Sequence, residues 1–115
     1  MADTYTHFAL AYTAETHLND TPTAIAHYTT VTTDGTVAGL REQAFGNLGR
    51  LHGLSGDTEA AIQTTRKGLE EFPLSAVLHN NIAVAYAAQG DQKRAAAHQA
   101  EAARITQLQQ PAPPQ

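Results

Sequence analysis

The amino-acid sequence predicts an all-α protein, an α-solenoid of three antiparallel helix pairs, and three observations lead to this class. Apolar residues recur at helical spacing, as in Leu48, Leu51 and Leu54, and no alternating strand pattern of useful length occurs. Short polar motifs mark where helices end and begin. Similar residues recur 34 positions apart in the second half of the chain, which is typical of stacked helix pairs.

The helix boundaries are marked by a few capping motifs. Gly56-Asp57 and Gly90-Asp91 each supply a glycine that can end a helix in the left-handed conformation and an aspartate that can cap the next helix. In the segment 19–22, asparagine takes the left-handed position, aspartate or threonine caps, and proline suits the first turn. Ser75 is a further cap candidate. These marks predict six helices, at about 4–18, 22–33, 40–54, 58–71, 76–89 and 92–108.

The chain of 115 residues has the usual size of one domain. We expect this domain to cover residues 1–108. The remaining segment, 109–115, is polar and rich in proline and glutamine, which predicts a disordered tail or the stub of a linker.

The middle and last helix pairs carry the same motif. Asp57 and Asp91 lie 34 residues apart, and Ala61 recurs as Ala95. The middle unit reads Phe45-x-x-Leu48-Gly49-x-x-His52, and the last reads His79-x-x-Ile82-Ala83-x-x-Tyr86. The first unit fits with an offset of 37, because three extra residues fall in the predicted loop 33–39.

This pattern resembles the tetratricopeptide repeat (TPR), in which an aromatic residue, leucine and glycine, tyrosine, alanine, an aromatic residue and proline recur over 34 residues. The resemblance covers about residues 5–108, with three repeats at about 5–38, 42–75 and 76–108. It departs from the pattern at Tyr12, which occupies a small-residue position, and at Thr65 and Gln99, which replace an aromatic residue. The resemblance implies a right-handed superhelix.

The motif also predicts which residues pack between helices. Small residues of the first helices, Gly49 and Ala83, let the second helices approach closely. We therefore expect the following residues to be buried: Ala24, Leu48, Ala61, Ile82, Tyr86 and Ala95.

Composition excludes several classes of partner. The formal net charge is −4, and the first forty residues contain no lysine or arginine, so no basic surface for nucleic acid or anionic membranes is expected. The absence of cysteine excludes disulfides and cysteine-based zinc sites. Residues 1–7 do not resemble a signal peptide, and no stretch approaches the ~20 apolar residues of a membrane span. The expected location is cytoplasmic.

Two patterns that often carry chemistry are incomplete. Glycines recur between positions 46 and 56, but no strand signal precedes them and no Gly-Lys-Ser/Thr follows, so a phosphate-binding loop is not expected. Ser55 and Ser75 lie near helix boundaries and outside any Gly-x-Ser-x-Gly elbow.

The adjacent carboxylates Glu70 and Glu71 are the remaining candidates for acid–base chemistry. They point to different sides of a helix, one turn after Arg66-Lys67, which favours solvated ion pairs. We therefore expect a protein that is not an enzyme.

The chain has six histidines, and no two lie three or four residues apart, so no helix face offers a ready pair of metal ligands. His52 and His79 occupy motif positions that are normally aromatic, which favours a packing role. No metal and no cofactor are expected.

The TPR resemblance implies that the first helix of each pair lines a concave surface that binds extended peptides. Carried over by position, the groove residues are Thr13, His17, Gln43, Gly46, Asn47, Arg50, Val77, Asn80, Asn81 and Val84, with Thr6, Ala9, Leu54 and Ala88 on the same surface. One TPR subgroup holds the C-terminal carboxylate of chaperone tails in a clamp of lysines, asparagines and arginine. Only Asn47 matches that clamp, so a chaperone tail is not the expected ligand.

Asn47 and Asn81 occupy the same motif position, one repeat apart. Their amides have two possible roles, pairing with a peptide backbone or bonding across to neighbouring helices, and the sequence leaves both open. Gly46 and Gly53 are expected to widen the groove, and Arg50 to hold a carboxylate.

The sequence therefore predicts a protein–protein interaction module that binds a peptide or partner protein in this groove. The alternative is a structural or assembly module that forms a homo-oligomer, or part of a larger complex, through its outer face or its ends.

Overall fold

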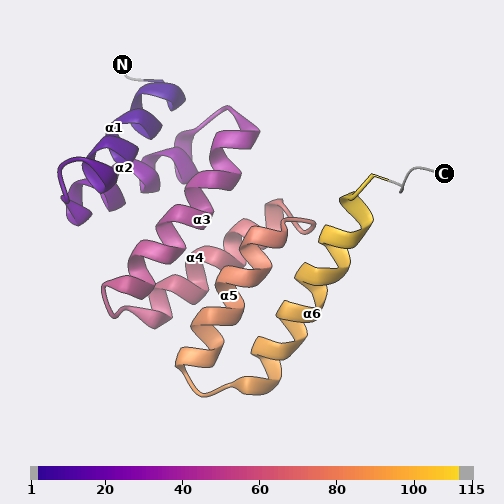
Figure 1. The fold of residues 1–115 in the computed structure, drawn as a ribbon. Helices are drawn as coiled ribbons and strands as arrows, with labels where there is room; N and C mark the ends of the chain where they lie inside the picture. The colour runs from indigo at the N-terminus through magenta and orange to yellow at the C-terminus, as the bar shows by residue number, and fades with distance from the viewer. Residues whose placement is uncertain (1–2, 112–115) are drawn as a thin grey trace.

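A computed structural model describes residues 3–111 and shows an all-α fold (Figure 1). No strand occurs among these residues, so the predicted fold class is confirmed. None of their helices combines the length and apolar character that crossing a membrane requires. The helices are α1 (Thr4–Thr16), α2 (Thr21–Asp34), α3 (Ala38–Leu54), α4 (Thr58–Glu71), α5 (Ala76–Ala88) and α6 (Gln92–Gln109). Helix α6 thus includes the first residue of the predicted tail, and residues 112–115 of that tail lie outside the described residues.

Five of the six helices begin with a side chain that caps the free backbone N–H groups of the first turn. In each case an oxygen of the capping side chain accepts a hydrogen bond from the N–H three residues further on, at 2.9–3.3 Å. Helix α3 is the exception, because Val37 precedes it. The capping residues are Asp3, Asp20, Asp57, Ser75 and Asp91, of which the sequence predicted all but Asp3.

Three turns between helices use a left-handed residue, as predicted. Gly56 and Gly90 have φ of 85° and 84°, and Asn19 has φ of 51°. Glycine has no Cβ to clash in this conformation, and asparagine tolerates it better than most residues. Each of these turns reverses the chain, so that consecutive helices lie antiparallel.

The helices stack in chain order, with the two described ends of the chain at opposite ends of the stack (Figure 1). Each helix contacts the next one along the chain. In addition α1 contacts α3 and α3 contacts α5, whereas α2, α4 and α6 do not contact one another within the described residues. The first helices of the pairs are therefore crowded and the second helices are spread apart, which makes the surface formed by α1, α3 and α5 the inner, concave side.

Most of the buried apolar residues fall into two clusters. One joins α1, α2 and α3 and includes Tyr28 and Leu48, and the other joins α4, α5 and α6 and includes Ile82 and Tyr86. All six residues that the repeat motif predicted to be buried are buried, which confirms that prediction.

Two glycines allow the close approach of helices. A Cβ at Gly49 would lie 2.5 Å from the hydroxyl oxygen of Thr65, so α4 packs almost against the backbone of α3. A Cβ at Gly68 would lie 2.9 Å from both Cβ and Cγ of Phe45 and 3.0 Å from Cδ1 of Leu78. Gly68 thus marks the place where α3, α4 and α5 meet.

Glu71 has a different partner from the one that helical spacing predicted. Its carboxylate accepts two hydrogen bonds from Arg41, at 2.7 and 2.9 Å, instead of pairing with residues 66–67 one turn back. Arg41 also donates to the carbonyl oxygens of Val31 and Gly35, both at 3.2 Å. The contact ties α4 to the start of α3 and the end of α2, and the hydrogen bonds from Arg41 hold the pKa of Glu71 below its usual value.

Candidate peptide-binding groove

A cavity of about 330 Å³ opens between α3 and α5, above the start of α4. Its floor is lined by small residues, which are glycines of α3 and alanines of α4 and α5. The lining residues are Gly49, Arg50, Gly53, Leu54, Thr58, Ala61, Asn81, Val84, Ala85 and Ala88.

Two aliphatic side chains stand at the rim of this cavity. Leu54, the last residue of α3, is 75% exposed, and Val84 on α5 is 69% exposed. Single exposed apolar residues are common, but here two of them face a cavity whose floor is also apolar. The arrangement offers a place where an apolar side chain of a ligand can leave water.

The polar side of the cavity is formed by Asn81 and Arg50. The amide of Asn81 donates a hydrogen bond of 3.0 Å to the carbonyl oxygen of Gly46 in α3. Its motif counterpart Asn47 donates a hydrogen bond of 3.2 Å to the hydroxyl of Tyr28 in α2. Both asparagines therefore bond across to a neighbouring helix, the second of the two roles that the sequence left open.

Arg50 belongs to a polar network that joins the first three helices. Its guanidinium forms an ion pair with Glu15 of α1. The hydroxyl of Tyr28 donates a hydrogen bond of 2.9 Å to the same carboxylate and accepts one from Asn47. Burial raises the pKa of Tyr28, and the hydrogen bond to Glu15 raises it further, so this hydroxyl stays protonated and remains a donor. Glu15 partly neutralises the one cation at the cavity.

The structure brings together only some of the predicted groove residues. Arg50, Asn81 and Val84 line the cavity, together with Leu54 and Ala88 from the same predicted surface. Asn80 lines a separate hollow with residues of α6. The other exposed predictions lie outside the cavity, and they are Thr13, His17, Gln43 and Val77.

The structure does not agree with the role expected for Gly46 in the groove. It is buried, and a Cβ built on it would lie 3.5 Å from Val77 and 3.6 Å from the amide nitrogen of Asn81. Because α5 covers it, Gly46 does not widen the groove, and that expectation is wrong. Gly53 is exposed and lines the cavity.

The sequence did not identify several residues of this site as groove residues. The repeat motif predicts Gly49 and Ala61 only as packing positions, and it predicts no role for Ala85 or Glu15. Ala61 could have been found, since it repeats with Ala95 at the point where two helices approach most closely. Glu15 carried no such signal, because its partners lie 13 and 35 residues away in the sequence.

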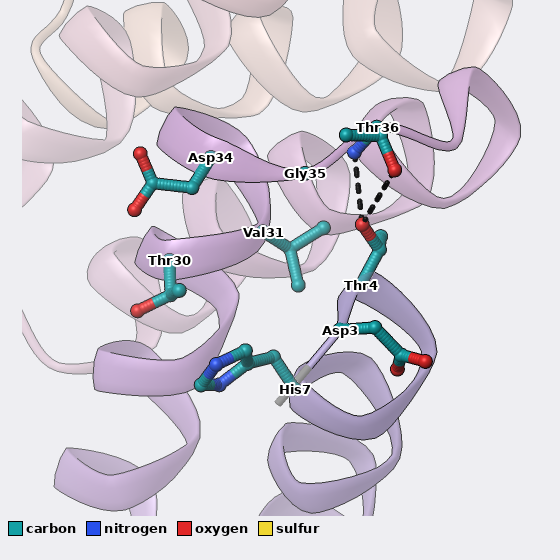
Figure 2. A pocket seen from close by; sticks show the side chains of 8 residues that line it. All are labelled: Asp3, Thr4, His7, Thr30, Val31, Asp34, Gly35 and Thr36. Atoms are coloured by element: carbon teal, nitrogen blue, oxygen red, sulfur yellow. Dashed lines mark hydrogen bonds between the residues drawn. The ribbon is translucent and has the colours of Figure 1, made fainter. Parts of the chain in front are cut away.

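A second cavity, of about 490 Å³, lies between the start of α1 and the end of α2 (Figure 2). A hydrogen bond of 2.8 Å from the Thr36 N–H to the Thr4 hydroxyl closes one side of it. Figure 2 shows that the carboxylates of Asp3 and Asp34 point to opposite sides. They do not converge on one ligand, and Asp3 already caps α1. Although it is the larger cavity, it is a weaker candidate site than the groove between α3 and α5.

Among residues 3–111, no group of three or more histidine, aspartate or glutamate side chains is placed to hold a metal ion.

Solved structures of MamA share this architecture. "Crystal structure of MamA" superposes with a TM-score of 0.79 at 16% sequence identity, over 92% of this chain and 60% of that one. "MamA MSR-1 C2" gives a TM-score of 0.78 at 18% identity, over 94% and 60%. A third structure, "Crystal structure of MamA protein", gives 0.77 at 15% identity, over 97% and 61%. The fold is that of a helical repeat solenoid.

Six helices in this arrangement fit a TPR-type fold. At these identities the likeness to MamA concerns the fold alone, and the chain spans about 60% of the length of those MamA chains. Neither a family model nor a curated protein sequence matches the chain.

Proposed function

We propose that this protein is an interaction module that binds an extended peptide segment of a partner protein in the groove between α3 and α5. The observation that carries the proposal is the apolar cavity of about 330 Å³ on the concave side. Its volume falls in the range of about 300–1,000 Å³ that is usual for ligand sites. The helical repeat fold supports the proposal, since stacked helix pairs form extended concave binding surfaces.

The lining of the cavity defines the chemistry of the peptide. Leu54 and Val84 at the rim and the alanine and glycine floor suit an aliphatic side chain such as leucine or methionine. Asn81 uses one amide N–H to bond Gly46, so its remaining N–H and its carbonyl oxygen suit the peptide backbone. Arg50 shares its charge with Glu15, so a carboxylate on the ligand contributes only weakly.

Binding without catalysis is the proposed role. The residues that line the cavity include one hydroxyl, that of Thr58, and no histidine or carboxylate to act as its base. We therefore propose that the protein is not an enzyme and uses no cofactor in this groove.

The test uses two leucines with similar exposure. Peptides would first be selected from a displayed library against the purified protein, and their affinity measured by fluorescence anisotropy. Leu54→Glu places a charge at the apolar rim and is expected to weaken binding at least tenfold. Leu74→Glu is the matched control, because Leu74 is 62% exposed in the loop before α5 and lies outside the cavity.

The two variants should be equally stable, since both leucines are exposed. If no peptide is selected, or if both variants bind like the original protein, the groove is not the binding site.

A second candidate function is assembly through the ends of the solenoid. Helix α1 exposes Tyr5 and Tyr12, which lie two turns apart on one face of the helix. Residues 3–40 contain four carboxylates and no lysine or arginine, whereas α6 contains three cations and one carboxylate. A second copy stacked head to tail would bring the acidic, partly apolar end of one chain against the more basic end of the next.

Sedimentation velocity over a range of concentrations tests this alternative. Head-to-tail assembly predicts species that grow with concentration and shrink when Tyr12→Lys is introduced. A monomer at all concentrations would exclude it and leave the groove proposal unaffected.

A further inference from the structure

Two pairs of histidines meet across helices, one pair at each end of the solenoid. In the first helix pair, Nδ1 of His7 on α1 lies 3.0 Å from Nδ1 of His27 on α2. In the last helix pair, Nδ1 of His79 on α5 lies 3.0 Å from Nδ1 of His98 on α6. All four side chains are half-buried. Neither contact was visible from spacing within one helix, because each joins residues about twenty positions apart.

The two pairs have the same geometry. The ring centroids lie 5.2 Å apart in each pair, close to the largest separation that two imidazoles can have when their nitrogens are 3.0 Å apart. The rings therefore meet edge to edge, with the two Nδ1 atoms aimed at each other. This is the geometry of a hydrogen bond in which one Nδ1 carries the proton and the other accepts it.

For the pair on α5 and α6 the structure decides which nitrogen donates. Nε2 of His79 lies 3.0 Å from the carbonyl oxygen of Pro73. A carbonyl can only accept, so this Nε2 carries the proton, and Nδ1 of neutral His79 is then an acceptor. His98 must donate from its own Nδ1.

Counting protons shows when the bond is lost. With both histidines neutral, one Nδ1–H is shared between the rings. One further proton can bind at Nε2 of the donor ring without breaking the bond. A second further proton occupies the accepting Nδ1, so two N–H groups and two positive charges then face each other at 3.0 Å. In the unfolded chain both histidines take up protons independently.

We propose that these pairs act as acid-sensitive latches, which open the first and last helix pairs in mild acid while the middle pair stays closed. The middle helix pair, α3 and α4, has no such latch. Three residues after its motif alanine, Ala61, it has Thr64, where the other two helix pairs have His27 and His98. Helix α5 lines the peptide groove, so loosening α6 from its back also loosens one wall of that groove. This consequence rests on the proposed function, whereas the latch itself does not.

The groups around the second pair, His79 and His98, also disfavour a positive charge on His98. The Tyr86 ring stacks on His98 with centroids 5.7 Å apart, and Glu101 lies one turn further along α6 in an ion pair with Arg104. Burial lowers the pKa of His98 and the neighbouring His79 lowers it further, against the opposing effect of Glu101. Helix α4 reaches this cluster through Arg66, which donates to the Tyr86 hydroxyl at 3.3 Å. Arg94 of α6 lies over the same ring.

Because the pKa of His98 is lower in the folded protein than its ordinary value of 6.5, His98 contributes its full stabilisation above pH 6.5. This contribution is lost as the pH falls through the pKa that His98 has in the folded state.

The first pair, His7 and His27, has different neighbours. Asp3 and Asp34 line the same cavity as His7, and α3 adds Arg41, which bonds carbonyls at the end of α2. The geometry between the rings is the same as in the second pair, because the two Nδ1 atoms again face each other at 3.0 Å.

A metal chelate is the competing interpretation of two close imidazoles. It fits less well, because the facing Nδ1 atoms point at each other and not at a common third point, and no third ligand is placed beside either pair in the described residues. The experiment therefore includes zinc.

Hydrogen exchange at pH 7.5 and pH 5.5 tests the latch helix by helix, with rates corrected for the intrinsic effect of pH. We expect protection in α1, α2, α5 and α6 to fall at least tenfold more than in α3 and α4. Each histidine pair in the folded protein binds one proton fewer than the same two residues in the unfolded chain. The equilibrium constant for unfolding should therefore rise about tenfold per pH unit and per pair below pH 6.5.

Three variants separate the pairs. His98→Gln keeps a donor for His79 but removes one titrating ring, so the acid response of α5 and α6 should disappear while that of α1 and α2 remains. His27→Gln should do the reverse. His17→Gln is the control, since His17 is exposed at the end of α1 and belongs to neither pair. Equal acid sensitivity of all six helices, or an unchanged response in both pair variants, would overturn the proposal.

If the variants do not fold, an NMR titration of the original protein decides. The proposal requires one histidine of each pair to stay unprotonated at pH 5.5, and full protonation of all four paired histidines at that pH would contradict it. So would binding of one zinc ion per pair at pH 7.5 in calorimetry.

Discussion

Replacing Gly68 with alanine tests whether close helix packing holds the middle of the solenoid together. An alanine Cβ at this position would lie 2.9 Å from Cβ and Cγ of Phe45. The Cβ of Phe45 is fixed by the backbone of α3 and cannot rotate away, so α3 and α4 must move apart. Cδ1 of Leu78, at 3.0 Å, blocks movement toward α5.

The size of the effect follows from two opposing contributions. Alanine in the interior of a helix is favoured over glycine by about 1 kcal/mol. Forcing an extra carbon into a packed core costs about 1–3 kcal/mol, and the cost lies at the upper end when the obstructing atoms are fixed. We expect Gly68→Ala to lower the free energy of unfolding by about 1–2 kcal/mol, which corresponds to a fall of about 4–8 °C in the thermal midpoint.

Gly39→Ala is the matched control for this measurement. Gly39 lies in the first turn of α3, and a Cβ built on it has no other atom within 4 Å. This substitution should stabilise the protein by up to about 1 kcal/mol. Thermal and urea unfolding would be followed by circular dichroism. If Gly68→Ala matches or exceeds the stability of the original protein, the packing argument at this junction is refuted.

Three further predictions follow from the contacts described above. Ala61→Glu should prevent folding, because it places an unpaired charge where α3 and α4 touch, and a folded variant by circular dichroism would contradict this. Glu71→Gln should cost about 0.5–1 kcal/mol at neutral pH by removing the ion pair with Arg41. Because the pKa of Glu71 is lowered, the difference between the two proteins should shrink as the pH falls below 4.5 and vanish once Glu71 is protonated in the folded state, as denaturant titrations would show. Val84→Glu should weaken binding of a selected peptide at least tenfold, whereas Val77→Glu, two turns away on α5 and outside the cavity, should not, and equal effects in anisotropy would argue against the cavity as the binding site.

The positions of the helices could be predicted from the sequence because their boundaries depend on local chemistry. An aspartate at position 57 caps α4 through atoms three residues away, and Gly56 before it needs no tertiary partner to adopt a positive φ. The 34-residue register then predicted which alanines are buried, since a repeated contact places equivalent residues in equivalent environments. Local rules and repetition therefore predict the fold class and most of the core.

The contacts between side chains of different helices could not be predicted in the same way. Whether Asn47 faces a ligand or Tyr28 depends on how α3 is rotated about its axis relative to α2. Rotating α3 by one residue position would turn the Asn47 side chain toward a different neighbour. The same is true of Gly46, whose exposure depends on where α5 crosses α3. Both cases require the relative placement of two helices, which no pattern within one helix contains.

The division of the buried residues into two clusters has a consequence for how the chain is made. The first cluster uses residues between 11 and 51, and every contact between elements joins helices no more than two places apart in the chain. During synthesis the first cluster is complete once α3 has left the ribosome, before any residue of α4 is needed. Folding of this protein requires no long loop to close, so its contact order is low and its folding should be fast, beginning at the N-terminus as the chain emerges.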